Sequence, residues 1–180
     1  MITYDDLGKH RKAILWKNDL PFSTKREGYL SKKVIQLSEP LTSNSTSFAL
    51  ELSLPRNSAY YALLGVEYIP VDTTEIVIEV NISESVKERY ESLLKNEPIY
   101  IGIPAEYASS IIETAEQSLN AIGWQYSGKL KFSIGAHSVV GSSPSIFSRV
   151  CRILVSLLSN SLTSKTQKDE EEIIISELNN

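Results

Sequence analysis

Residues 103–123 read IPAEYASSIIETAEQSLNAIG, and this stretch decides the fold class. Pro104 suits the first position of a helix, and Gly123 suits the left-handed conformation in which many helices end. Between them, apolar residues recur at helical spacing, so we predict an amphipathic helix from Pro104 up to Gly123. Its apolar stripe consists of Ala108, Ile111, Ile112, Ala115, Leu119 and Ile122.

The residues that follow predict a strand and a second helix. Leu130, Phe132 and Ile134 alternate with polar residues, which favours a strand with these three side chains turned inward. A second apolar stripe then runs from Pro144 to Asn160. We expect the two helices to lie side by side on one face of a sheet.

The residues before this stretch mainly predict strands. The pattern alternates over residues 48–54 and 76–82, and a shorter candidate spans residues 34–37. Residues 59–71 are apolar and rich in tyrosine, and the pattern assigns them to neither class. Ser85-Val-Lys-Glu88 has the form of a capping box, so we predict a further helix over residues 85–94.

The second half of the chain resembles the fourth domain of translation elongation factor G. The resemblance is carried by Ile103-Pro-Ala-Glu-Tyr107 opening a helix, by a strand ending in a glycine-containing loop, and by Ser142-Ser143 with Phe147 shortly after. Gly28-Tyr29 through Val34 to Glu39-Pro40 is similar to the first strand of that family. The resemblance covers residues 98–160 and, more loosely, residues 25–40.

This resemblance implies an α+β fold, with a mainly antiparallel sheet, two helices on one face and a left-handed βαβ crossover. We expect a single domain over residues 1–162, with residues 41–97 as an insertion-like, strand-rich region, followed by an acidic tail over residues 163–180. In the translocase, two tip loops enter the ribosomal decoding site. The corresponding residues here, 24–27 and 135–141, lack the family's residue types, and no GTPase motif is present.

Composition narrows the classes of partner. The chain has 180 residues, a formal net charge of −4 and a pI of about 5.3, which disfavours nucleic acid because phosphate binding needs a basic excess. A local basic surface remains an alternative. It would consist of Lys9, Arg11, Lys12, Lys25 and Arg26. The single cysteine and the absence of a signal-peptide pattern or an apolar membrane-spanning run lead us to expect a cytoplasmic protein.

The strongest candidate site is Gly141-Ser142-Ser143, which precedes a predicted helix. Free N–H groups at a helix N-terminus suit a phosphate or carboxylate, and the small-molecule kinases of the same fold superfamily use a related glycine-serine loop. Ser143 acting only as a helix cap explains the pattern equally well. Cys151 lies in an apolar stripe and is interpreted as a core residue, and the two histidines are too isolated for a metal site.

Three consecutive isoleucines follow the acidic run of the tail. Ile173-Ile-Ile175 is apolar and β-prone, so we predict that it packs on the edge of its own sheet or against a second copy in a homodimer.

The sequence therefore predicts a non-enzymatic module that binds a protein partner without a cofactor. An RNA- or ribosome-associated module and a phosphate-ligand-binding protein remain the alternatives.

Overall fold

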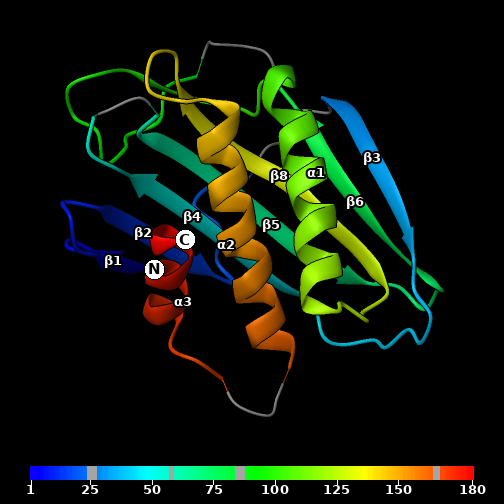
Figure 1. Ribbon diagram of the computed structural model, residues 1–180. Coiled ribbons are helices and arrows are strands. Elements are labelled where there is room, and N and C mark those ends of the chain that lie inside the picture. Colours follow the sequence, from blue (N-terminus) through cyan, green and yellow to red (C-terminus); the bar gives the residue numbers. More distant parts are fainter. Residues whose placement is uncertain (24–27, 57–58, 84–87, 164–166) are drawn as a thin grey trace.

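The computed structural model describes residues 1–23, 28–56, 59–83, 88–163 and 167–180. These residues form an eight-stranded sheet and three helices, coloured along the chain in Figure 1. The elements in chain order are β1 (Ile2–Tyr4), β2 (Lys12–Lys17), β3 (Tyr29–Gln36), β4 (Thr46–Ser53), β5 (Tyr61–Pro70), β6 (Glu75–Ile82), β7 (Ile99–Ile101), α1 (Ala105–Ile122), β8 (Gly128–Ser138), α2 (Pro144–Leu162) and α3 (Glu170–Asn179).

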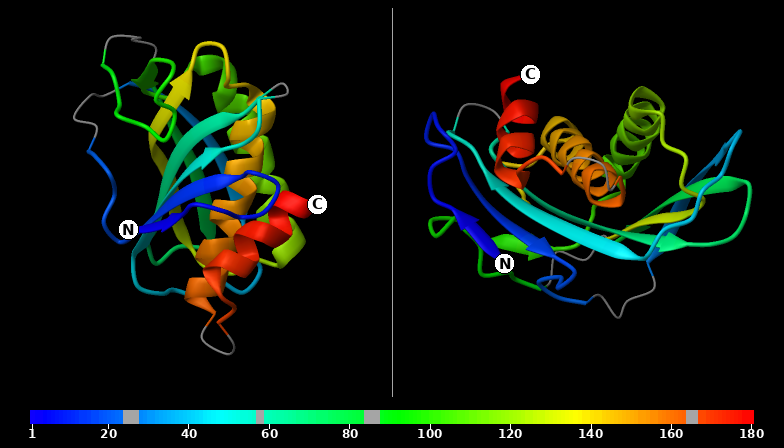
Figure 2. Two further views of the ribbon diagram at one scale, coloured as in Figure 1. Left: turned by 90° about the vertical axis from the view of Figure 1, so that its left-hand side faces the viewer. Right: turned by 90° about the horizontal axis from the view of Figure 1, so that it is seen from below.

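The strands lie in the order β1-β2-β4-β5-β8-β6-β3, and β7 pairs with the end of β8. Every pairing is antiparallel except that of β6 with β8, which is parallel. Figure 2 shows that the sheet is curved, with all three helices on its concave face. The prediction of an α+β fold with a mostly antiparallel sheet is confirmed.

The two long helices are confirmed close to their predicted bounds. α1 ends at Gly123, whose φ of 67° is the left-handed conformation expected there. α1 and α2 lie side by side, where the Tyr107 and Phe147 rings stack with centroids 4.7 Å apart. Ile112, on the predicted stripe of α1, is 9% exposed.

The strands predicted over residues 48–54 and 76–82 are β4 and β6, and the unassigned residues 59–71 contain β5. β4 and β5 are central strands with almost wholly buried side chains. Residues buried on both faces show no alternation, which explains why the pattern did not assign β5. Residues 41–97 thus supply the middle of the sheet.

A bulge in β8 corrects one prediction. The register with β5 shifts between Gly65 and Glu67, and a shift of one residue sends the following side chains to the other face. Leu130 and Phe132 therefore join the core beneath the helices. Ile134, predicted on the same face, is buried in a second cluster on the opposite face, beside Trp16 and other residues.

The helix predicted over residues 85–94 is wrong for the residues that the structure describes. Residues 84–87, which hold most of the capping box, lie outside them. From Glu88 onward the chain is extended and irregular: Ile101 N donates to Glu88 O, and Tyr90 N donates to Ile99 O. The apolar residues here cover the second cluster of the sheet instead of forming a helical stripe.

The tail prediction is also corrected. Ile173–Ile175 lies in the helix α3, and neither forms an edge strand nor needs a second copy for burial. Ile173, Ile174 and Leu178 are buried within the same chain, and α3 packs against α2. In Figure 1 it lies beside α2, over the β1–β2 side of the sheet.

Candidate functional site

The turn between β8 and α2 contains the predicted Gly141-Ser142-Ser143 site, and Ser138 organises it. Ser138 Oγ accepts hydrogen bonds from Val140 N (3.2 Å) and Gly141 N (2.8 Å). The same oxygen donates to Glu97 Oε2 over 2.5 Å. One hydroxyl at the end of a strand therefore fixes the backbone of the turn and ties it to the segment before β7.

The polar groups of Ser142 are also used within the protein. Its Oγ donates to Tyr61 O (2.6 Å) and accepts from Ser138 N (2.9 Å). Ser143 makes no side-chain cap and instead shares a hydrogen bond with Ser145 Oγ (2.8 Å). Of the three residues predicted to bind an anion, Gly141 and Ser142 thus donate hydrogen bonds to other atoms of the protein.

Gly141 is required by close packing. Its carbonyl accepts hydrogen bonds from Tyr60 N and Tyr61 N, and a Cβ added to it would lie 2.3 Å from the Tyr60 ring. Arg56 lies over the same ring, 5.4 Å from its centroid, and also forms an ion pair with Glu97 (3.4 Å). The glycine therefore lets the turn lie against an aromatic ring.

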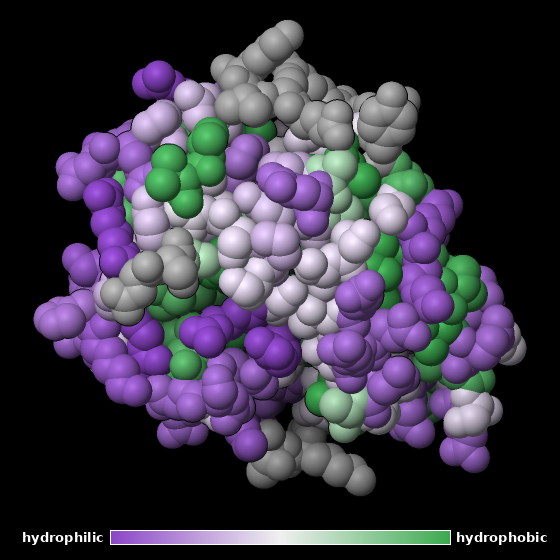
Figure 3. Space-filling view, turned by 45° about the horizontal axis from the view of Figure 1, so that its top comes forward, coloured by the Kyte–Doolittle hydropathy of each residue, from purple (hydrophilic) through white to green (hydrophobic). Residues whose placement is uncertain are grey.

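This framework presents two apolar side chains to solvent. Val139 is 67% exposed and Val140 is 79% exposed, although both follow a buried strand. Glycine, asparagine and aspartate are the usual turn residues, and β-branched residues are not. Figure 3 shows hydrophobic surface at the upper left of the molecule, over this turn. The sequence pattern recorded the two valines only as a departure from the family's tip loop.

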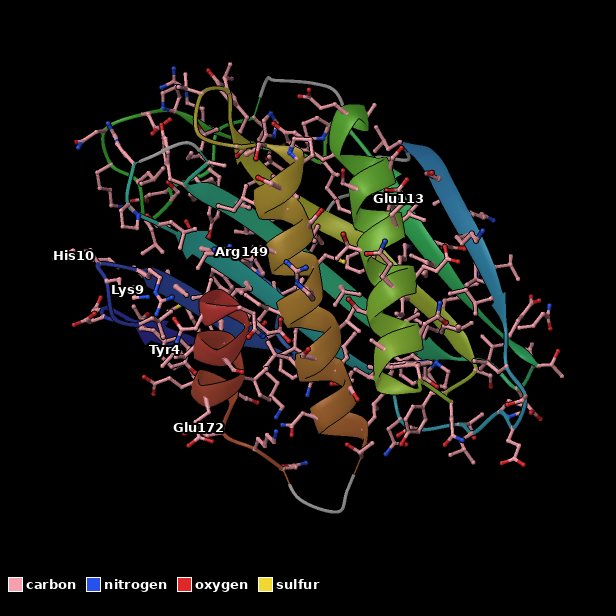
Figure 4. The ribbon with its side chains drawn as sticks, viewed as in Figure 1. Tyr4, Lys9, His10, Glu113, Arg149 and Glu172 are labelled. Atoms are coloured by element: carbon pink, nitrogen blue, oxygen red, sulfur yellow. The ribbon has the colours of Figure 1, made fainter. Side chains whose placement is uncertain are left out.

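The five predicted basic residues do not form one described surface. Lys9 lies in the turn between β1 and β2, at the left of Figure 4, and Lys12 is exposed on β2. Arg11 is only 7% exposed and donates to Leu7 O, Gly8 O and Asn179 Oδ1. Its guanidinium links the β1–β2 turn to α3. Lys25 and Arg26 lie outside the described residues.

Cys151 is a core residue, as interpreted from the sequence. It is fully buried, and its thiol lies 3.4 Å from Ile111 O of α1. Burial raises the pKa of this thiol well above its usual range, and Arg152 only partly offsets that rise. A thiol held in the protonated form is a poor nucleophile.

His137 is buried on the helix-bearing side of β8. Its Nδ1 donates to Gly102 O over 3.1 Å, and the rings of Tyr100 and Tyr107 lie nearby. Burial lowers the pKa of His137 below its ordinary value, which favours the neutral imidazole. In the described part of the chain, no group of three or more histidine, cysteine or acidic residues is placed to hold a metal ion.

Glu51 on β4 is a buried acid that the sequence pattern treated only as an outward-facing strand residue. It is 1% exposed, and its Oε1 accepts from Tyr61 Oη (3.0 Å) and from Leu93 N (2.8 Å). It therefore fastens the segment before β7 to the face of the sheet opposite the helices. Because it is buried and bonded to Tyr61 and Leu93, we interpret it as a structural residue.

Comparisons with protein-family models, with curated proteins and with solved structures gave no match. None of the helices described is long and apolar enough to cross a membrane. The turn between β8 and α2 is consequently the candidate site because of its geometry alone.

Proposed function

We propose that this protein is a non-enzymatic binding module that contacts a protein partner through Val139 and Val140. The observation that carries the proposal is the exposure of these two valines on a turn whose backbone is fixed by Ser138 and Ser142. A partner with an apolar pocket is the matching chemistry, because valine offers no hydrogen-bonding group and no charge.

The energetics favour such a contact. Fully burying a valine side chain contributes roughly 1.5–3 kcal/mol, and a few such residues carry most of the affinity of many interfaces. A turn that is already ordered loses little conformational entropy on binding. Hydrogen bonds within residues 138–142, together with bonds from this segment to Tyr60, Tyr61 and Glu97, hold the turn in the free protein, so the valines are presented without further ordering.

We further propose an elongation-factor-G domain IV-like scaffold for the module. Support comes from β6 and β8, which are parallel and connected through α1. In Figure 1, with the helices toward the viewer and both strands running upward, β8 lies to the left of β6, as in a left-handed crossover. On this scaffold, Val139 and Val140 occupy a loop whose counterpart in the translocase reaches into a binding partner.

The two alternative functions gain less support. An RNA-binding surface would need Arg11 at the surface, but its guanidinium bonds to backbone and to Asn179. A phosphate site at Gly141-Ser142-Ser143 would need the Ser142 hydroxyl, which donates to Tyr61 O. We therefore retain protein binding as the proposed function.

The proposal can be tested by site-specific cross-linking. A photoreactive benzoylphenylalanine is placed at position 140 of the full chain in the producing cells, and the cross-linked protein is identified and purified. It is then titrated against the wild type and against the variant Val139→Ser plus Val140→Ser. Loss of about 1.4 kcal/mol corresponds to tenfold in affinity, so we expect the double variant to bind at least tenfold more weakly.

Val71→Ser provides the matched control, because Val71 is also an exposed valine (39%) but lies in the turn between β5 and β6. This variant should bind as tightly as the wild type. Equal binding by the wild type and the double variant would contradict the proposed site. Equal cross-linking from positions 71 and 140 would contradict it as well.

A further inference from the structure

The β3 strand forms one edge of the sheet, and its outer side is open. β3 pairs with β6 over eight consecutive residues, from Tyr29–Ile82 to Gln36–Glu75, without a register shift. It is the last strand in the sheet order, and it lies at the right-hand margin of the molecule in Figure 1 and in the right-hand view of Figure 2. The opposite edge strand, β1, has only three residues. No described residue outside β6 forms a ladder with β3, so within the described chain its outer backbone groups have no strand partner.

Exposed strand edges are usually short, interrupted or charged, because an open edge pairs with other chains. β3 is neither short nor interrupted. Leu30 is 45% exposed and Val34 is 48% exposed, and both lie on the face away from the helices. Two lysines, Lys32 and Lys33, lie between them.

Neither lysine is fully neutralised by its ion pair, so both can still attract a negatively charged partner. Lys32 approaches Glu79 at 3.8 Å and Lys33 approaches Glu116 at 3.9 Å, while about half of each lysine side chain stays exposed. Ion pairs of this length at the surface contribute little. A strand laid along β3 would therefore meet two cations, one on each face of the sheet.

This charge pattern argues against a second copy as the occupant. If two β3 strands paired antiparallel around a two-fold axis near their centres, Lys32 and Lys33 of one chain would face the same lysines of the other. Like charges directly opposite one another in a ladder are unfavourable. The lysines block self-pairing and leave the edge open to a strand of opposite charge.

We propose that β3 accepts an extended acidic segment of another protein by strand addition. In the antiparallel orientation, the side chains opposite Val34, Lys33, Lys32 and Leu30 define the sequence that fits. Along the peptide, this sequence is apolar, acidic, acidic, any residue, apolar. The unrestricted fourth position lies opposite the residue between Lys32 and Leu30. Backbone hydrogen bonds to β3 supply the pairing, and the two acidic residues select the segment. This inference is independent of the turn proposed above, because β3 and that turn are separate surfaces.

The test uses the capped peptide Thr-Val-Glu-Glu-Thr-Val-Thr and the full-length, 15N-labelled protein. We expect amide shift changes concentrated on residues 29–36 during titration. In the variant Lys32→Gln plus Lys33→Gln, binding should weaken at least fivefold, since both cations are removed from the edge. Both lysines are exposed, so this variant should remain folded, as its own spectrum will show.

Three controls separate strand addition from simple charge attraction. Lys12→Gln removes a cation from β2, near the opposite edge of the sheet, and should leave binding unchanged. The peptide Thr-Val-Lys-Lys-Thr-Val-Thr should not bind. A peptide N-methylated at both glutamates loses donors on both of its edges and should not bind either.

The proposal is overturned if the methylated peptide binds as well as the unmodified one, or if shift changes appear away from β3. It is also overturned if the free wild-type protein sediments as a dimer and dilution to the monomer shifts the amide signals of residues 29–36, because the occupant would then be a second copy. Failure at β3 leaves the cross-linking result at position 140 unaffected.

Discussion

Glu51 is a buried residue of the central strand β4, and its two carboxylate oxygens have different surroundings. Oε1 accepts from Tyr61 and Leu93, whereas Oε2 is buried without a partner in the described part of the chain. Burial raises the pKa of Glu51 above its ordinary value of 4.5, and the hydrogen bonds from Leu93 and Tyr61 oppose that rise. The ionised form is therefore less stable in the folded protein than in the unfolded chain.

Glu51→Gln tests this assignment. An acid whose folded pKa is raised loses stability as pH rises from the unfolded pKa through the folded pKa. Glutamine keeps an acceptor for Tyr61 and Leu93 but carries no charge. At pH 8 we expect the free energy of unfolding of the variant to exceed that of the wild type, by about 1.4 kcal/mol for each unit by which the folded pKa of Glu51 exceeds the unfolded one.

The difference should shrink toward pH 4, where both side chains are neutral. Denaturant unfolding at the two pH values measures it, with Glu91→Gln as a control because Glu91 is largely exposed. A variant less stable than the wild type at pH 8 would show that the carboxylate is stabilised by its surroundings.

The three isoleucines of α3 have high β propensity, yet they form a helix. Burial and helix capping outweigh that propensity. Asp169 caps the helix by accepting from Glu171 N (3.1 Å), and three glutamates occupy the first turn, where negative charge suits the helix dipole. Burial, followed by the negative charges of Glu170, Asp169 and Glu171, raises the pKa of the partly buried Tyr4 to about 12. Lys17 adds an ion pair to Glu170 (2.8 Å). In Figure 4, Tyr4 lies beside α3.

Ile174→Ala tests whether α3 stabilises the chain that carries it. Ile174 is fully buried, and truncating a buried isoleucine to alanine costs about 2–5 kcal/mol. Since 1 kcal/mol shifts Tm by roughly 2–4 °C in a chain of this size, a decrease of at least about 4 °C is expected in thermal unfolding. Sedimentation should show the same mass before and after the change.

Ser176→Ala is the control, because Ser176 lies on the same helix and is exposed. Equal Tm values for the two variants would mean that α3 does not hold the fold together. A change of mass in the Ile174 variant would instead restore the intermolecular interpretation of the tail.

Across the whole chain, local sequence patterns predicted the elements whose structure depends mainly on nearby residues. The stripe and terminal residues of α1 located that helix, and alternation located β4 and β6. The bulge in β8 depends on pairing with β5, a strand far away in sequence, and no local pattern reports it. For the same reason, no local pattern reports that Gly141 and Ser142 are bonded to Tyr60, Tyr61 and Ser138, and anion binding at Gly141-Ser142-Ser143 stays a prediction.

Two exposed apolar surfaces lie on separate parts of the protein. One is the turn with Val139 and Val140, and the other is the edge strand β3 with Leu30 and Val34. Hydrogen bonds to Ser138 hold the turn in place, and a continuous ladder with β6 holds β3. Fixed apolar groups at the surface are typical of contact sites, whereas apolar groups on mobile loops are not pre-organised for binding.

The proposed function requires that the β8–α2 turn is ordered before any partner binds. Backbone 15N relaxation of the free protein measures this directly, as order parameters for Val139, Val140 and Gly141. We predict values of about 0.85, as for rigid backbone, and a fall toward about 0.6 in Ser138→Ala, which removes the acceptor of two amides in the turn. Values below about 0.6 in the wild type would contradict the claim, because the valines would then lie on a mobile loop and not on a preformed contact site.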